Sequence, residues 1–181
     1  MKNLPLGIQT FKNIIEEDYI YVDKTKDIYE LLAYKGKYFF LSRPRRFGKS
    51  LLVTTLKEIF SGNKELFKGL WIYNKIKWQK YPVIRLDFSS LSFETPEKLR
   101  INLGSRISEF ADDFKISIDN NRDYKDKFRK LIKKLSEKEK VVVLIDEYDK
   151  PIIDFIDNPE IALENRTILK NFYETLKSSE E

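Results

Sequence analysis

The chain has 181 residues, a net charge of +5, no cysteine and no histidine. Without those two residue types it has no disulfide framework, no thiolate or imidazole metal site, and no Cys-His or Ser-His-Asp catalysis. With 41% hydrophobic and 14% aromatic residues, it is long and apolar enough to bury a core. The remaining chemistry uses carboxylates, Lys, Arg, hydroxyls, backbone amides and a hard, oxygen-bound metal such as Mg²⁺.

The sequence predicts a cytoplasmic protein without a membrane partner. No apolar run is long enough to span a bilayer, and the first residues lack the apolar centre of a signal peptide. The charge is unevenly distributed. Residues 1–90 hold 17 basic and 9 acidic residues, a net charge of +8, whereas residues 91–181 hold 17 and 20, a net charge of −3. The basic half is therefore the better candidate for contact with anions.

In the first half, apolar patterning predicts two helices and two strands. Thr25 is suited to cap a short helix, and residues 37–41 (Lys-Tyr-Phe-Phe-Leu) indicate a buried strand. Residues 50–60 carry apolar side chains at helical spacing, and Gly62 follows as a C-terminal stop. Residues 82–88 (Pro-Val-Ile-Arg-Leu-Asp-Phe) indicate a second strand.

The second half predicts three helices and a central strand. Thr95-Pro96 is a favourable helix start, and further helices are expected from Tyr124 and from Pro159. Residues 141–145 (Val-Val-Val-Leu-Ile) are typical of a buried parallel strand. Strands that alternate with amphipathic helices indicate an α/β fold with three layers and a mainly parallel sheet. The apolar positions of the last helix are Ile161, Ile168, Leu169, Phe172 and Leu176.

A candidate phosphate-binding loop lies between the strand predicted at 37–41 and the helix predicted at 50–60. It reads Ser-Arg-Pro-Arg-Arg-Phe-Gly-Lys-Ser over residues 42–50. Gly48 allows backbone amides to approach phosphate oxygens, and the helix N-terminus favours an anion. Lys49 is suited to neutralise the β- and γ-phosphates, and the Ser50 hydroxyl to ligate Mg²⁺.

The match to the full phosphate-loop pattern is partial, because Arg43 stands where that pattern has glycine. One alternative is an ordinary helix start, with Gly48 in a turn and Lys49 in solvent. Another is that Arg43, Arg45 and Arg46 form a solvated basic loop or a nucleic-acid patch. If nucleotide binds, these arginines are suited to phosphate oxygens, as static contacts or with one acting as an arginine finger.

A candidate metal and base site follows the strand predicted at 141–145. A buried strand that ends in Asp146-Glu147 matches the Walker B pattern, with Asp146 for Mg²⁺ and Glu147 as general base. The alternative is an acidic strand end at a solvated edge. Asp149 is a solvated acid, a helix cap or a support for the site. Asp87, at the end of the other predicted strand, is a candidate to face the nucleotide edge, which the sequence alone does not decide.

Arg-Pro-Arg-Arg-Phe-Gly-Lys-Ser over residues 43–50 closely resembles the bacterial and archaeal family of predicted AAA-ATPase-like proteins. Residues 4–11 (Leu-Pro-Leu-Gly-Ile-Gln-Thr-Phe) and 21–25 (Tyr-Val-Asp-Lys-Thr) are similar to two further family motifs. Residues 144–151 (Leu-Ile-Asp-Glu-Tyr-Asp-Lys-Pro) are similar to the family's Walker B block. The resemblance runs from about residue 4 to the end, and Arg43 in place of glycine is the family's own pattern.

The resemblance implies an ATP-binding domain that uses Mg²⁺. Residues 1–36 are expected as an N-terminal extension and 37–181 as the nucleotide-binding core, with residues 83–88 as the strand between the two motif strands. The family's sensor strand and nuclease-like domain are not found, so we expect a chain truncated before the sensor strand and no nuclease activity from these residues. The residues expected to contact nucleotide are Arg43, Pro44, Arg45, Arg46, Phe47, Gly48, Lys49, Ser50 and Leu51.

Three functions compete at this point. The first is ATP binding with hydrolysis, carried by Lys49 and Glu147. The second is a nucleotide-dependent interaction switch with little turnover, which involves a protein partner or self-association. The third is a nucleic-acid-binding module, indicated by the basic first half and the many aromatic residues.

Overall fold

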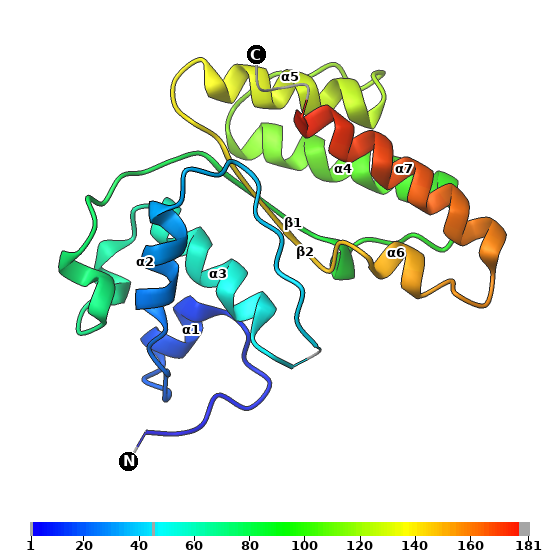
Figure 1. Ribbon diagram of the computed structural model, residues 1–181. Helices are drawn as coiled ribbons and strands as arrows, with labels where there is room; N and C mark the ends of the chain where they lie inside the picture. Colours follow the sequence, from blue (N-terminus) through cyan, green and yellow to red (C-terminus); the bar gives the residue numbers. More distant parts are fainter. Residues whose placement is uncertain (1, 45, 178–181) are drawn as a thin grey trace. The chain divides into compact units, whose positions relative to one another are not determined.

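The computed structural model describes residues 2–44 and 46–177. Contacts divide the chain into two compact units, Met1–Val83 and Ile84–Glu181, each with its own hydrophobic core. Figure 1 shows the elements of the first unit from blue to green and those of the second from green to red. Each candidate motif therefore belongs to one unit and is positioned by the elements of that unit.

The first unit is helical. It contains α1 (Phe11–Glu16), α2 (Thr25–Ala33) and α3 (Lys49–Phe60), followed by the short 3₁₀ segments η1 (Lys64–Phe67) and η2 (Trp71–Asn74). Aromatic rings fill its centre, because Phe67 stacks on Phe11 at 4.7 Å between ring centroids and meets Trp78 at 5.0 Å. The helix predicted at 50–60 is confirmed, and Gly62 follows it with a φ of 75°.

The N-terminal segment is bound directly to α3. The buried Thr54 hydroxyl of α3 accepts a hydrogen bond from the Phe11 amide at 3.1 Å and lies 2.9 Å from the Gln9 carbonyl oxygen. Tyr21 adds an edge-to-face contact with the Phe11 ring at 5.1 Å. Residues on both sides of position 36 thus belong to one packed unit.

The start of α2 differs from the prediction that Thr25 caps it. Thr25 is the first helical residue, and the carboxylate of Asp23 accepts hydrogen bonds from both its amide (2.8 Å) and its hydroxyl (2.7 Å). The other carboxylate oxygen accepts the Trp71 amide at 2.7 Å. Partial burial alone would raise the pKa of Asp23, but these hydrogen bonds outweigh burial and lower it. Asp23 therefore joins α2 to η2.

The predicted strand at residues 37–41 is wrong, since this stretch, all of which the structure describes, is a loop. Its large apolar side chains are exposed, with Phe40 at 72% and Phe39 at 52%. A strand gains stability from a neighbouring strand and from a covered face. The apolar composition of this stretch predicts burial, but its side chains are not covered here.

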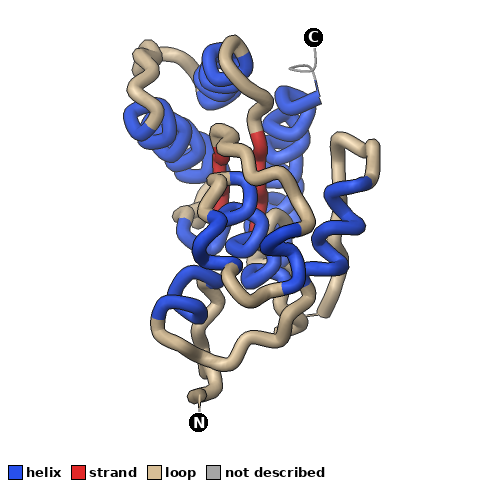
Figure 2. The backbone as a smooth tube through the Cα atoms, turned by 90° about the vertical axis from the view of Figure 1, so that its left-hand side faces the viewer, coloured by secondary structure: helices blue, strands red, loops and turns tan. Residues whose placement is uncertain are grey.

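The second unit holds a parallel pair of strands, β1 (Val83–Asp87) and β2 (Val142–Asp146), which lie side by side in Figure 2. A short 3₁₀ segment, η3 (Phe88–Ser90), follows β1. The helices are α4 (Pro96–Asp113), α5 (Tyr124–Ser136), α6 (Lys150–Ile153) and α7 (Pro159–Lys177). The predicted strands and helices of this half are confirmed, with ends shifted by one or two residues. The structure is mixed helix and strand, with a sheet of two strands among the described residues.

Helices α4, α5 and α7 pack against one another, and apolar side chains from all three enter one core. The caps are in place, because Thr95 accepts the Lys98 amide at the start of α4 and Asp123 accepts the Asp126 amide at the start of α5. Phe128 meets Phe172 at 4.7 Å between ring centroids, which joins α5 to α7. No helix in the described part of the chain is long and apolar enough to cross a bilayer.

Candidate functional site

The phosphate-loop candidate ends where α3 begins. Gly48 is the residue before the helix and has a left-handed φ of 74°, and its carbonyl oxygen accepts the Leu52 amide at 2.9 Å. A Cβ atom at Gly48 would have nothing within 4 Å. The position thus requires glycine for its backbone conformation rather than for space. The loop and the helix of the predicted motif are both present, whereas the strand before them is not.

The Lys49 side chain folds back over the loop. Its ammonium group donates to the Arg43 carbonyl oxygen at 2.7 Å and lies 3.3 Å from that of Pro44. These acceptors are neutral and exposed, so an anionic oxygen would form a stronger, charge-assisted hydrogen bond with the same ammonium group. The Lys49 side chain therefore links the start of α3 to the backbone of the loop before it.

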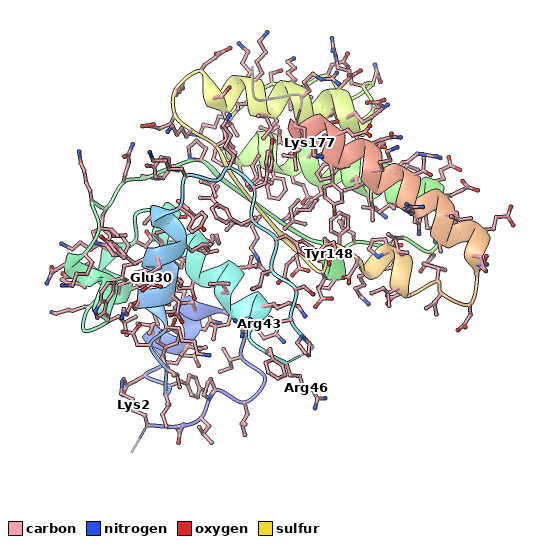
Figure 3. The ribbon with its side chains drawn as sticks, in the orientation of Figure 1. Lys2, Glu30, Arg43, Arg46, Tyr148 and Lys177 are labelled. Atoms are coloured by element: carbon pink, nitrogen blue, oxygen red, sulfur yellow. The ribbon has the colours of Figure 1, made fainter. Side chains whose placement is uncertain are left out.

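The tip of the loop is exposed. Arg43, Pro44, Arg46 and Phe47 are all exposed, and Arg46 has a left-handed φ of 67°, uncommon for a residue with a side chain. Figure 3 shows the Arg46 side chain pointing away from α3. Arg45, part of the predicted nucleotide-contacting set, lies outside the described residues. The described arginine side chains are thus placed for contact with a ligand or a partner.

Ser50 and Leu51 lie in the first turn of α3. Ser50 is half-buried close to the helix N-terminus, where backbone N–H groups are not used by the helix. Leu51 packs against the core of its unit, and its carbonyl oxygen accepts the Thr55 hydroxyl at 2.7 Å. Ser50 therefore has the better position for a ligand, whereas Leu51 anchors the turn.

In the second unit, β2 ends at a buried carboxylate. Asp146 is 4% exposed, and one of its oxygens accepts the Glu147 amide at 3.1 Å. The basic residues on the neighbouring elements are paired elsewhere, since Arg85 binds Asp87 at 3.1 Å and Lys150 binds Asp154 at 2.5 Å. A buried carboxylate without a cationic partner among the described residues suits a bound cation.

The turn after Asp146 has an uncommon backbone. Glu147 is half-buried and has a φ of 51°, and its carbonyl oxygen accepts the Lys150 amide at 3.0 Å. Tyr148 follows and is labelled in Figure 3. The Tyr173 hydroxyl of α7 lies 3.5 Å from the Tyr148 carbonyl oxygen. Burial, and then the nearby Tyr148 and Asp149, raise the pKa of Tyr173, which therefore stays a neutral hydrogen-bond donor.

The chain matches the family model described as "Predicted AAA-ATPase" over residues 5–181. It belongs to this predicted AAA-ATPase family. A curated relative, "Uncharacterized protein in vnfD 5'region" from Azotobacter chroococcum mcd 1, is 42% identical over 183 residues. The match covers 99% of this chain and 35% of the relative, so the chain spans about a third of the relative's length. No solved structure matches the chain.

Membership of the predicted AAA-ATPase family implies nucleotide binding. Gly48, Lys49 and Ser50 lie in the first unit, and Asp146 and Glu147 in the second. Their convergence on one ligand stays a prediction. The described residues contain no group of three or more acidic side chains that could hold a metal. Mg²⁺ bound through one or two protein oxygens and phosphate does not need such a group.

Asp87 and Asp149, whose roles the sequence left undecided, both lie next to short helical segments in this predicted AAA-ATPase. Asp87 accepts the Ser89 amide at 2.9 Å and the Ser89 hydroxyl at 2.6 Å, and it pairs with Arg85, so it caps η3. Asp149 occupies the N-cap position of α6 without a side-chain cap hydrogen bond. Neither is therefore needed to explain the candidate metal site.

The sequence reasoning missed one residue that contacts the segment after the turn at Glu147. Asn165 of α7 is fully buried and donates to the Pro151 carbonyl oxygen at 2.8 Å. A signal was present, because Asn165 lies four residues after Ile161 and three before Ile168, on the apolar stripe of the predicted helix. A polar residue on such a stripe indicates a buried partner, but the sequence does not name that partner.

Proposed function

We propose that the chain binds Mg-ATP and hydrolyses it, with the loop from Arg43 to Ser50 as the phosphate cradle. The observation that carries the proposal is the start of α3. There, a left-handed Gly48 leads into a helix N-terminus and the Lys49 ammonium lies over the loop. Backbone N–H groups, helix potential and a lysine are the means by which phosphate loops bind anions.

Phosphate binding would use Lys49 first. Its ammonium group would exchange the carbonyl oxygens of Arg43 and Pro44 for phosphate oxygens, replacing neutral acceptors with charged ones. Arg43, Arg45 and Arg46 would add planar guanidinium groups to the same charge. The nucleotide-contacting set expected from the sequence, with Phe47 and Leu51 at its margins, belongs to this proposal.

Mg²⁺ would be held by the Ser50 hydroxyl and Asp146. The buried carboxylate of Asp146, which has no cationic partner among the described residues, fits such an ion. When bound, Mg²⁺ supplies positive charge against the β- and γ-phosphate oxygens. Both residues offer oxygen ligands, which Mg²⁺ prefers.

Glu147 would act as the general base. A water oxygen attacks the γ-phosphorus as its bond to the bridging oxygen breaks, and the water proton passes to the Glu147 carboxylate. Lys49 would counter the charge that develops on the leaving phosphate. This arrangement requires the two motifs to meet, so the proposal includes a three-layer P-loop fold with residues 37–181 as the core and 1–36 as an extension.

The first test is ligand-dependent stability. Mg-ATP at about 100 times its dissociation constant should stabilise the wild type by roughly 2.7 kcal/mol. Lys49→Ala should lose this gain, whereas Lys57→Ala, an exposed lysine on the same helix, should keep it. Thermal unfolding with ATP, GTP and no nucleotide measures the effect. The same melting temperature under all three conditions would reject nucleotide binding.

A second candidate function is a nucleotide-dependent switch with little turnover. It is favoured by the exposed loop tip, where Phe47 is 63% exposed and a ligand on Lys49 would alter the loop. Phosphate release separates the two functions. Hydrolysis predicts that Glu147→Gln keeps the nucleotide-induced stabilisation and loses turnover, with Glu160→Gln in the first turn of α7 as the control. A switch predicts negligible turnover in the wild type as well.

A further inference from the structure

Asn165 has an unusual position for an amide side chain. It is fully buried on α7, its Nδ2 donates to the Pro151 carbonyl oxygen at 2.8 Å, and its Oδ1 is buried without a hydrogen-bond partner in the described part of the chain. An unpaired buried acceptor is a cost to the fold. The hydrogen bond from Nδ2 to the Pro151 carbonyl oxygen compensates for this cost.

The Pro151 carbonyl group requires that donor. Pro151 is buried in the four-residue helix α6, and the backbone amides that follow bond to other residues. The Asp154 amide donates to Lys150 at 3.0 Å, and the Phe155 amide donates to Ile152 at 3.1 Å. The Asn165 side chain thus supplies the hydrogen bond that helix α6 is too short to make.

Backbone hydrogen bonds connect this contact to Glu147. The amides of Ile152 and Ile153 donate to the Asp149 carbonyl oxygen, and the Lys150 amide donates to that of Glu147. Residues 147–153 therefore form one short hydrogen-bonded segment, which starts at the left-handed φ of Glu147. A residue with a side chain keeps such a φ when surrounding contacts fix it.

We propose that Asn165 is a positioning residue that holds α6 and, through it, the backbone of Glu147. Its hydrogen bond holds segment 147–153 at Pro151, while β2 ends at Asp146, directly before the segment. The role of this segment in hydrolysis rests on the proposed function. The attachment of the segment to α7 does not.

The test uses Asn165→Leu, which removes the donor and the unpaired acceptor together and suits the apolar stripe of α7. Its control is Ile168→Val, which trims a buried side chain on the same helix. We expect amide hydrogen exchange at Lys150, Ile152 and Ile153 to be about tenfold faster in Asn165→Leu, with no such change in the control. We also expect kcat to fall about tenfold while the KM for Mg-ATP stays unchanged.

Each outcome decides one question. Unchanged exchange in segment 147–153 would overturn the positioning role. Faster exchange combined with a turnover no lower than that of Ile168→Val would also overturn it. If the wild type neither binds nor hydrolyses ATP, the proposed function fails, and hydrogen exchange alone then decides the attachment. Asn165→Ala gives the same exchange test should Asn165→Leu not fold.

Discussion

The two candidate motifs are held in different ways. In the Lys49 loop, the described residues before α3 are exposed, and the Lys49 ammonium group donates to the carbonyl oxygens of Arg43 and Pro44. The turn at Glu147 follows the buried Asp146 and is fastened to α7 through Asn165. The described residues of the first motif are thus mostly exposed, whereas the second motif lies beside a buried carboxylate and a hydrogen bond from a packed helix. Exposed regions with few buried contacts open locally more easily than packed ones, so the two motifs should respond differently to substitution.

The largest effect should come from breaking the core of the unit that holds the second motif. Phe172 is 1% exposed on α7 and packs against Phe128, so Phe172→Ala should destabilise its unit by about 3–5 kcal/mol. Both tryptophans, Trp71 and Trp78, lie in the first unit. Urea unfolding followed by circular dichroism should therefore show the loss of stability in Phe172→Ala. The unfolding transition followed by tryptophan fluorescence should shift less. Equal shifts in both signals would contradict separate stabilisation of the two regions.

The conformation of the exposed loop should depend on the backbone of Gly48. Gly48→Ala should cost about 1–2 kcal/mol, because its φ is left-handed although the space is open. Gly69 is a matched control, since it has a φ of 86° and equally open surroundings outside the loop. Gly69→Ala should cost a similar amount, measured by urea unfolding, but keep the Mg-ATP stabilisation that Gly48→Ala loses. Loss of that stabilisation in both variants would contradict a specific role for the loop.

The first unit, which carries the exposed loop, also contains a carboxylate held by several hydrogen bonds, that of Asp23. Asp23→Asn should destabilise this unit by about 1 kcal/mol at neutral pH, because the hydrogen bonds to Thr25 and Trp71 weaken. The pKa of Asp23 is lowered, so its contribution is present above the unfolded pKa of about 4 and is lost as the pH falls through the folded pKa. Unfolding followed by tryptophan fluorescence should show that the variant has a lower free energy of unfolding than the wild type at pH 7. This difference should be smaller at pH 3.

Asp27→Asn is the control for this pH effect, because Asp27 lies exposed in the first turn of α2. It should change stability by a few tenths of a kcal/mol, as expected for a charge near a helix start. If the stability difference between wild type and Asp23→Asn stays constant between pH 7 and pH 3, the ionised carboxylate is not the source of that stability.

The smallest effect is expected at the loop tip. Phe47 is 63% exposed, so Phe47→Ala should change stability by less than about 0.5 kcal/mol, far below Phe172→Ala. Urea unfolding of the two variants gives the comparison directly. A loss above about 2 kcal/mol at Phe47 would mean that the loop is packed rather than free.

Local signals predicted much of this structure. The start of α4 was predictable because Thr95 and Pro96 form a cap and a first turn, and β2 was predictable from its run of β-branched residues. The helix after Gly48 was also predictable, because glycine and the apolar spacing mark its start. These features depend on neighbours in sequence, which a single chain displays.

Features that depend on distant partners were not predictable. Residues 37–41 have the composition of a strand, but a strand also needs a neighbour and a cover, and neither is encoded locally. Thr25 was an apparent cap, yet it is the first helical residue. Asp23 accepts its amide and also reaches the Trp71 amide, 48 positions away. Asn165 was visible as a polar interruption, whereas its bond to Pro151 depends on how α6 and α7 pack.

The contact of Thr54 with the N-terminal segment has a consequence for the order of folding. It joins α3 to residues 43 and 45 positions away, so the chain must close a long loop before the contact forms. The entropic cost of closure rises with loop length, and non-local contacts of this kind slow folding. Helices α4 and α5, which are neighbours in sequence, close a shorter loop when they pack. Helix α3 should therefore dock onto the N-terminal segment late, after helices α4 and α5 have paired.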